Sequence, residues 1–278
     1  MFKTLIDPSA LAKHIGDPGW VIVDCRFDLT DPAKGEQQYR EGHIPGARYA
    51  HLDRHLSGPK TGKNGRHPLP DPAAFGAWIG RQGLSPGDTV VCYDQGSGAL
   101  AARLWWMLRW IGHDSVAVLD GGIAKWRKEN RPTTAEVPQF APKTYPVKAR
   151  ADMAVDVGYV QANLGKALLV DARSPQRYRG ESEPIDPVAG RIPGALNRSN
   201  SDNLSPDGVF KQPEELRKDF LAVLGGRQPG EVVNYCGSGV SATHNALAME
   251  IAGLTGSRLY AGSWSEWIAD PGRPQEKG

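Results

Sequence analysis

The chain has 278 residues, of which 40% are hydrophobic and 23% are charged. This composition is typical of a folded globular protein and excludes disordered and fibrous classes. At roughly 150 residues per domain, the length favours about two compact domains. Lys and Arg total 33 against 31 Asp and Glu, a net charge of +2. This balance disfavours a nucleic-acid platform.

The sequence predicts no membrane span, secretory signal, disulfide or bound metal. Arginines interrupt the longest apolar stretch, around residues 100–111, whereas a span needs about 18 consecutive apolar residues. The N-terminus has no hydrophobic core followed by a small-residue cleavage site, so we expect a cytoplasmic protein. Cys25, Cys92 and Cys236 are far apart and form no CxxC pair. We therefore predict reduced thiols and no metal or other cofactor.

An internal repeat indicates the architecture. Four landmarks recur in the same order at offsets between 141 and 148 residues. They pair 21–26 with 168–173, 44–47 with 192–195, 90–94 with 232–236, and 121–126 with 262–267. A duplicated domain explains this pattern.

A segment with three prolines, Val137 to Pro146, lies between the two halves and favours extended backbone. We therefore predict a domain at 1–136, a proline-rich linker at 137–148 and a second domain at 149–278. In each half, short β-branched runs alternate with helix-like stretches, here 37–40, 72–82, 98–111, 213–224 and 240–254. This alternation predicts an α/β fold in which each domain has a mostly parallel sheet with helices on both faces.

The loop after the apolar run 232–235 carries the candidate chemistry. It reads Cys236, Gly237, Ser238, Gly239, Val240, Ser241, Ala242 and leads into a helix-like stretch. The two glycines permit positive φ, which lets backbone N–H groups turn inward and hold an anion at the helix N-terminus. Such groups favour a thiolate, so we predict that Cys236 is a nucleophile.

The loop spacing separates two possible chemistries. A cysteine phosphatase needs an arginine at the sixth position after its cysteine, and this chain has Ala242 there. Phosphate-monoester hydrolysis is therefore disfavoured. Sulfur transfer needs only a thiolate that takes a sulfur atom and backbone N–H groups that hold the resulting persulfide.

These motifs resemble those of the two-domain rhodanese-type sulfurtransferases, over nearly the whole chain. The resemblance rests on the Asp-x-Arg segments at 24–26 and 171–173, Gly42 to Ala47, Asp120 to Trp126, Gly262 to Trp267 and the Cys236 loop. It implies two tandem rhodanese-like domains. Only the second would be catalytic, because the first has Asp94 where the second has Cys236.

The resemblance also implies the donor and its site. The Cys-Gly-Ser-Gly-Val start of the loop matches the family's 3-mercaptopyruvate enzymes, and an uncharged loop suits a monocarboxylate better than a dianion. Arg177 matches the family's substrate-binding arginine, and Arg179 is a candidate second cation. We expect the loop backbone to complete the donor site at Gly237, Gly239, Val240 and Ser241. The mercaptopyruvate enzymes commonly carry a further arginine that is missing here before Arg191, so thiosulfate stays as the alternative donor.

A proton relay is a further implication of the resemblance. Asp53, His67 and Ser238 match a relay proposed for the mercaptopyruvate enzymes, which would protonate the leaving enolate. The expected partners are a small sulfur donor and an acceptor, which is cyanide, a small thiol or a thioredoxin-like protein. The rival hypothesis is a noncatalytic rhodanese-like binding module. Cys25 and Cys92 lie in strand-like runs, and we expect both to be inert.

Overall fold

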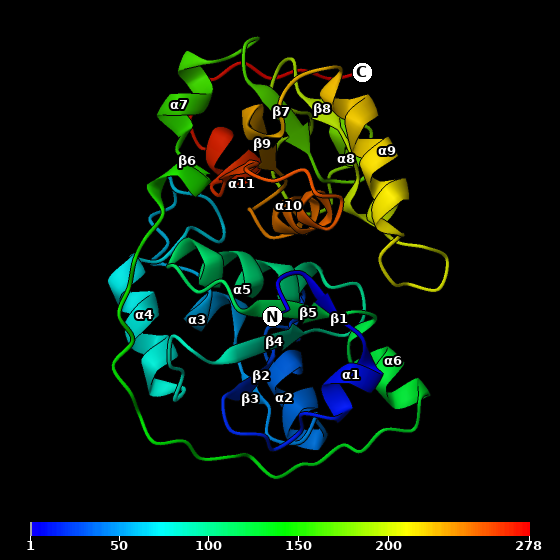
Figure 1. Ribbon diagram of the computed structural model, residues 1–278. Coiled ribbons are helices and arrows are strands. Elements are labelled where there is room, and N and C mark those ends of the chain that lie inside the picture. The colour runs from blue at the N-terminus through cyan, green and yellow to red at the C-terminus, as the bar shows by residue number, and fades with distance from the viewer. Residues whose placement is uncertain (1) are drawn as a thin grey trace. The chain divides into compact units, whose positions relative to one another are not determined.

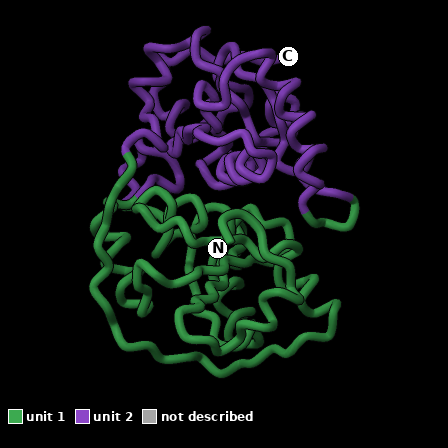
Figure 2. Tube along the Cα trace, viewed as in Figure 1, with its two compact units in different colours: residues 1–58, 70–150, 206–209 green, residues 59–69, 151–205, 210–278 purple. Residues whose placement is uncertain are grey.

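The computed structural model (Figure 1) describes residues 2–278 and contains two compact units. Unit 1 comprises the chain up to Gly58 together with 70–150 and 206–209 (Figure 2). Unit 2 comprises 59–69, 151–205 and 210–278. The proline-rich segment 137–148 thus belongs to unit 1, whereas residues 59–69, which precede it in sequence, belong to unit 2.

Unit 1 is built on a five-stranded parallel sheet with the strand order β1-β5-β4-β2-β3. The strands are β1 (Leu5–Ile6), β2 (Trp20–Asp24), β3 (Arg48–Tyr49), β4 (Thr89–Tyr93) and β5 (Val116–Leu119). The helices are α1 (Pro8–Ala12), α2 (Lys34–Glu41), α3 (Leu52–His55), α4 (Pro72–Arg81), α5 (Ala99–Trp110) and α6 (Gly122–Lys128).

Unit 2 repeats this topology with the order β6-β10-β9-β7-β8. The strands are β6 (Ala154–Val155), β7 (Leu168–Asp171), β8 (Leu196–Asn197), β9 (Val232–Tyr235) and β10 (Arg258–Tyr260). The helices are α7 (Val157–Ala162), α8 (Pro175–Arg179), α9 (Pro213–Leu224), α10 (Ser241–Ile251) and α11 (Ser263–Trp267), with 3-10 turns at Ala151–Met153, Asn200–Asn203 and Pro229–Glu231. The identical strand order confirms the predicted duplicated α/β fold.

The sheets place the candidate loops at equivalent points. Strand β9 pairs with β7 on one side and β10 on the other, so it lies inside its sheet. All four of its residues are buried, as expected for a strand covered on both faces. Cys236 follows directly after β9, and Asp94 follows directly after β4. Both residues therefore lie at the carboxyl edge of a parallel sheet, where ligands bind in such folds.

The long helices follow their sequence patterns, and the predicted stretch 37–40 lies within α2, whereas the other short helices were not predicted. Helix α9 has the predicted bounds, and α4, α5 and α10 lie within the predicted stretches. Helices α8 and α11 have five residues each. A helix this short is scarcely more than one turn and shows no hydrophobic period.

The proline-rich segment packs against α4 in unit 1. A Cβ on Gly80 would lie 2.2 Å from the carbonyl oxygen of Lys143, and one on Gly76 would lie 2.2 Å from Cγ2 of Val147. Only glycine permits this approach, and the Lys143 N–H then donates to the Gly80 carbonyl at 2.8 Å. Within residues 2–278, no helix has both the length and the apolar character needed to cross a bilayer.

Candidate active site

The sulfur of Cys236 faces backbone N–H donors. The N–H of Gly239 donates to Sγ at 3.1 Å, and the N–H of Ser238 lies 3.5 Å from the same atom. Cys236 is buried and retains 3% exposure. Donors converging on a sulfur atom stabilise its anionic forms, which are the forms that attack or carry sulfur.

Gly239 is required for this loop geometry. Its φ is +75°, and a Cβ at this position would lie 2.3 Å from the carbonyl oxygen of Ala261. Gly237 does not have a positive φ, contrary to our expectation, and it is needed for a different reason. A Cβ on Gly237 would lie 2.9 Å from Nη2 of Arg66 and 3.3 Å from Nη2 of Arg177, so its hydrogen leaves room for two guanidinium groups.

Helix α11 binds the carbonyl groups at the start of the Cys236 loop. The N–H groups of Trp264 and Ser265 donate to the carbonyls of Cys236 and Gly237, both at 3.0 Å. Ser263 Oγ accepts the N–H of Cys236 at 3.1 Å. Because these contacts occupy the carbonyls at the start of the loop, the N–H groups of Ser238 and Gly239 can turn toward the sulfur.

The first repeat fills the equivalent loop with its own carboxylate. Asp94 Oδ1 accepts the N–H groups of Gly96 and Gly98 at 2.9 and 3.0 Å. Its Oδ2 accepts those of Leu100 and Ala101, in the first turn of α5, at 2.9 and 3.3 Å. The loop of this repeat therefore holds an anion, and that anion is a fixed part of the chain.

His67 and Ser238 lie together within unit 2. Nδ1 of His67 is 2.8 Å from Oγ of Ser238, and both residues are buried. The segment 59–69 that carries His67 belongs to this unit even though it lies in the first half of the sequence. Asp53 is on α3 of unit 1, and its part in a relay stays a prediction.

Arg177 on α8 is held by two carboxylates. Its Nε donates to Glu183 at 3.1 and 3.0 Å, and its Nη2 donates to Glu183 at 2.6 Å and to Asp186 at 3.1 Å. Its Nη1 has no acceptor within the described chain and lies 3.5 Å from the Cβ position of Gly237. One guanidinium nitrogen of Arg177 is thus left for a ligand beside the Cys236 loop.

Arg66 is a second cation at the loop that the sequence analysis missed. Its Nη1 pairs with Asp186, and its backbone N–H donates to Ser265 Oγ at 3.0 Å. Its Nη2 lies against Gly237 and has no acceptor among residues 2–278. The available signal was its position directly before His67.

Burial and the neighbouring arginines shift the pKa values of Glu183 and Asp186 in opposite directions. Burial raises the pKa of Asp186, although the neighbouring Arg66 and Arg177 oppose this shift. At Glu183 burial also acts to raise the pKa. Hydrogen bonds from the side chain of Arg177 and the N–H of Asp186 outweigh it, and the pKa falls.

The remaining residues considered in the sequence analysis have differing surroundings. Val240 is the N-cap of α10, and Ser241 is its first residue. Arg179, on α8 with Arg177, pairs with Glu181 at 2.6 Å on the exposed surface instead of with the loop. Cys25 and Cys92 are buried in unit 1, and burial raises the pKa of Cys25 well above its usual value. No group of three or more metal-ligating side chains comes together in the described part of the chain.

Comparison with known proteins identifies the family. The family model described as "Rhodanese-like domain" matches residues 7–129 and 156–270. The chain is 48% identical over 278 residues to the "Probable 3-mercaptopyruvate sulfurtransferase" of Pseudomonas aeruginosa, covering 99% of this chain and 98% of that protein. It is 32% identical over 282 residues to the "Thiosulfate sulfurtransferase" of Mus musculus, covering 96% and 93%.

A solved structure agrees with these relatives. The 3-mercaptopyruvate sulfurtransferase from Leishmania major superposes with a TM-score of 0.84 at 32% identity, covering 95% of this chain and 74% of that one. The chain therefore belongs to the rhodanese-like family and is a sulfurtransferase with two tandem rhodanese-like domains.

Proposed function

We propose that this sulfurtransferase carries sulfur as a persulfide on Cys236, with 3-mercaptopyruvate as its preferred donor. The observation that carries the proposal is the pair of N–H groups directed at Sγ of Cys236. The first repeat supports it, because the same loop position there holds the Asp94 carboxylate through four N–H groups. A loop that binds a carboxylate in one copy is suited to a thiolate or persulfide anion in the other.

The first half-reaction transfers sulfur to the enzyme. The Cys236 thiolate attacks the thiol sulfur of 3-mercaptopyruvate, an S–S bond forms and the C–S bond breaks. The bonding electron pair leaves with the carbon as the enolate of pyruvate, which takes up one proton to give pyruvate. The new persulfide gives up the proton of the former donor thiol and stays in the loop as an anion, whose charge the N–H groups of Ser238 and Gly239 stabilise.

The second half-reaction returns the thiolate. An acceptor thiolate or cyanide attacks the outer sulfur of the persulfide, a new bond to sulfur forms and the S–S bond breaks with its electrons on Cys236. The acceptor class includes cyanide, small thiols and thioredoxin-like proteins. With thiosulfate, the alternative donor, the thiolate attacks the outer sulfur and sulfite leaves with the bonding pair.

In this proposal, His67 and Ser238 deliver the proton that the enolate takes up. The contact between His67 Nδ1 and Ser238 Oγ lets the hydroxyl donate to the enolate while the imidazole supplies a proton to the hydroxyl. Asp53 would orient His67 as the third member of the relay. Sulfite departure needs no carbon protonation, so the relay serves mercaptopyruvate specifically.

Arg66 and Arg177 form the proposed carboxylate site of the donor. Nη2 of Arg66 and Nη1 of Arg177 both lie against Gly237, next to Cys236, without acceptors from the described residues. Two N–H donors from two guanidinium groups suit the two oxygens of one carboxylate. In this proposal Arg66 takes the place of the second donor-binding arginine that is missing after Arg177.

The charges around this site favour a monoanion. Glu183 and Asp186 lie against the two arginines. Glu183 also contacts Arg173, which pairs with Asp171, so three carboxylates balance three guanidinium groups. A site close to neutral offers less to a doubly charged thiosulfate than to the single carboxylate of mercaptopyruvate. This balance is the structural reason for the proposed donor order.

Two-substrate kinetics test the proposal. Initial rates with cyanide as acceptor should give parallel double-reciprocal lines with either donor, since the persulfide separates the two half-reactions. At matched concentrations, kcat/KM should be at least tenfold higher for 3-mercaptopyruvate. A higher value for thiosulfate would establish the alternative donor. Intersecting lines would contradict the persulfide route, and no turnover with either donor would favour the binding module.

A further inference from the structure

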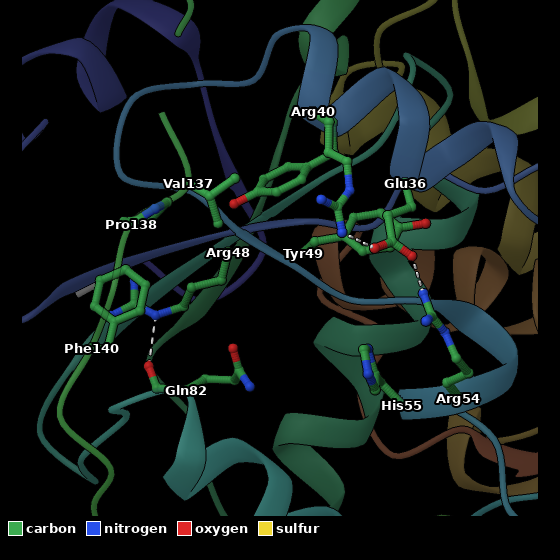
Figure 3. Close-up of a pocket in the computed structure, with 11 residues that line it drawn as sticks. Glu36, Arg40, Arg48, Tyr49, Arg54, His55, Gln82, Val137, Pro138 and Phe140 are labelled. Carbon is green, nitrogen blue, oxygen red and sulfur yellow. Dashed lines mark hydrogen bonds and ion pairs between the residues drawn. The ribbon is translucent and has the colours of Figure 1, made fainter. Parts of the chain in front are cut away.

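Unit 1 contains a pocket of about 290 Å³ that has no part in the chemistry above. Figure 3 shows its lining, which comes from α2, α3, β3, the end of α4 and the proline-rich segment. Its volume suits a molecule smaller than a drug-sized ligand. The nature of the side chains that face it indicates which molecule it takes.

Arg48 on β3 is a buried cation with two unused nitrogens. It is 8% exposed, its Nε donates to the Gln82 carbonyl at 2.7 Å, and its guanidinium carbon lies 3.4 Å from the ring centroid of Phe140. No acceptor for its two terminal nitrogens lies within residues 2–278. Burial lowers the pKa of Arg48 to about 10, so the group is still a cation at neutral pH. A buried guanidinium of this kind stabilises an anion placed at its free end.

His55 adds a neutral donor to the same pocket. Its Nδ1 accepts the N–H of His51 at 2.9 Å, which leaves the proton on Nε2. Its ring stacks on Trp78 at 4.9 Å, and burial lowers the pKa of His55 to about 4. His55 is therefore neutral at pH 7 and offers one N–H.

Apart from the side-chain amide of Gln82, which offers both a donor and an acceptor, the remaining polar groups of the lining are already engaged. The carboxylate of Glu36 is already bound by Arg40 and Arg54. The hydroxyls of Tyr39 and Tyr49 donate to backbone carbonyls at 2.8 and 3.0 Å, so their rings are what they offer to a ligand. Three arginines and one glutamate make the lining positive. Positive charge with free N–H donors selects an anion, and the aromatic rings of the lining suit a flat body attached to it.

We propose that this pocket binds a small planar carboxylate, which receives the two terminal nitrogens of Arg48 on its oxygens and packs its flat body against the aromatic rings. The site is specific to the first repeat. Arg48 pairs with Val23 in the β2–β3 register, and the equivalent pair in unit 2 joins Val170 to Leu196. The repeat that lacks the reactive cysteine would thus have a ligand site of its own, and this proposal is independent of the sulfur-transfer mechanism.

Isothermal titration calorimetry with benzoate tests the proposal. Benzamide is the matched neutral probe, because it has the same shape without the negative charge. An Arg177→Met background weakens carboxylate binding at the Cys236 loop, so that the loop contributes less to the measured heat. We expect benzoate to bind with one site per chain, and benzamide to bind at least tenfold more weakly because it lacks the charge-assisted bonds to Arg48.

Variants at Arg48 then assign the site. Arg48→Gln should weaken benzoate binding at least tenfold, whereas Arg131→Gln, which removes one charge from the same unit outside the pocket, should leave it unchanged. Since Arg48 also contacts Phe140, the melting temperature is measured in parallel, and Arg48→Lys replaces Arg48→Gln if that variant does not fold. Lys keeps the charge without the two-pronged geometry and should still weaken binding. Equal binding of benzoate and benzamide, or benzoate binding that is unaffected by the folded Arg48 variant, would overturn the proposal.

Discussion

In the proposed donor site, single side chains at the Cys236 loop take the place of a second donor-binding arginine on the segment after α8. Asp186 lies there instead, and it binds both Arg66 and Arg177. Arg66 thereby gains a fixed position against Gly237. Segment 59–69 thus supplies the Arg66 cation of the proposed site, and the segment after α8 supplies the Asp186 carboxylate that binds it.

Replacing Arg66 by Met tests this arrangement. We expect KM for 3-mercaptopyruvate to rise about tenfold or more, the loss that one charge-assisted hydrogen bond of about 1.5 kcal/mol produces, with a smaller change in kcat. Arg177→Met should behave in the same way. Arg179→Gln is the control, because Arg179 is on the same helix and pairs with Glu181 at the surface. Steady-state rates check all three, and an unchanged KM in Arg66→Met would exclude Arg66 from the donor site.

The Ser238 hydroxyl gives a second prediction at this scale. Ser238→Ala should lower kcat with 3-mercaptopyruvate by about 100-fold, a typical contribution of a positioned acid, and should affect thiosulfate much less. The reason is that only the enolate needs a proton on carbon. Ser257→Ala, at a serine of unit 2 outside the loop, is the control. An equal fall of kcat with both donors would indicate that Ser238 shapes the loop and does not move a proton.

Some side chains of the candidate site were predictable from the sequence, and others were not. Cys236 follows from glycine spacing after a strand, and His67 and Ser238 follow from family motifs. The contact of Arg66 with Asp186 joins residues 120 positions apart in the chain. No local pattern encodes such a contact, since it depends on how segment 59–69 packs within unit 2.

At the scale of elements, the Cys236 loop depends on its glycines and on α11. Two N–H groups of α11 occupy the carbonyls of Cys236 and Gly237. Gly239 adopts the left-handed turn directly after the two N–H groups, its own and that of Ser238, that face the sulfur. The loop therefore connects β9 to α10 and is held in place by hydrogen bonds from α11.

Gly239→Ala should damage both the fold and the activity. The new methyl group would meet the Ala261 carbonyl at 2.3 Å in a backbone region that disfavours side chains, and such strain costs about 1 to 3 kcal/mol. We expect a melting temperature lower by several degrees and a fall of at least tenfold in kcat/KM. Gly230→Ala is the control, because its nearest neighbour would lie at 3.8 Å. Calorimetry and rates that matched the wild type in Gly239→Ala would contradict the assigned loop geometry.

A helix or strand was predictable where it is long enough to show a hydrophobic period. Long helices such as α5 and α9 carry enough residues to show one. Helix α8 has five residues, yet it positions Arg177, and only the family motif pointed to it. Strand β3 has two residues and holds Arg48, so its pocket could not be foreseen from the sequence.

For the whole molecule, duplication explains both the fold and the division of roles. One strand order serves both units, and at the carboxyl edge of each sheet a loop directs backbone N–H groups inward. In unit 1 these groups bind the Asp94 carboxylate, which is a fixed part of the chain. In unit 2 they face Cys236, whose sulfur exchanges in the proposed mechanism.

Asp94→Asn tests this division. The amide NH2 would face N–H donors that now meet a carboxylate oxygen, so at least one hydrogen bond is lost and a buried donor is left unpaired. We expect the melting temperature to fall by several degrees, while purified folded protein still accepts sulfur on Cys236. Scanning calorimetry checks the first expectation. An unchanged melting temperature would show that the carboxylate does not stabilise its loop.

Intact-protein mass spectrometry after exposure to 3-mercaptopyruvate, followed by peptide mapping, tests whether Cys236 carries sulfur as a persulfide. We expect a gain of one sulfur atom on the peptide that contains Cys236. Cyanide should remove this sulfur, and Cys236→Ser should show no gain. Sulfur found on Cys25 or Cys92, or a gain that persists in Cys236→Ser, would contradict this role of Cys236.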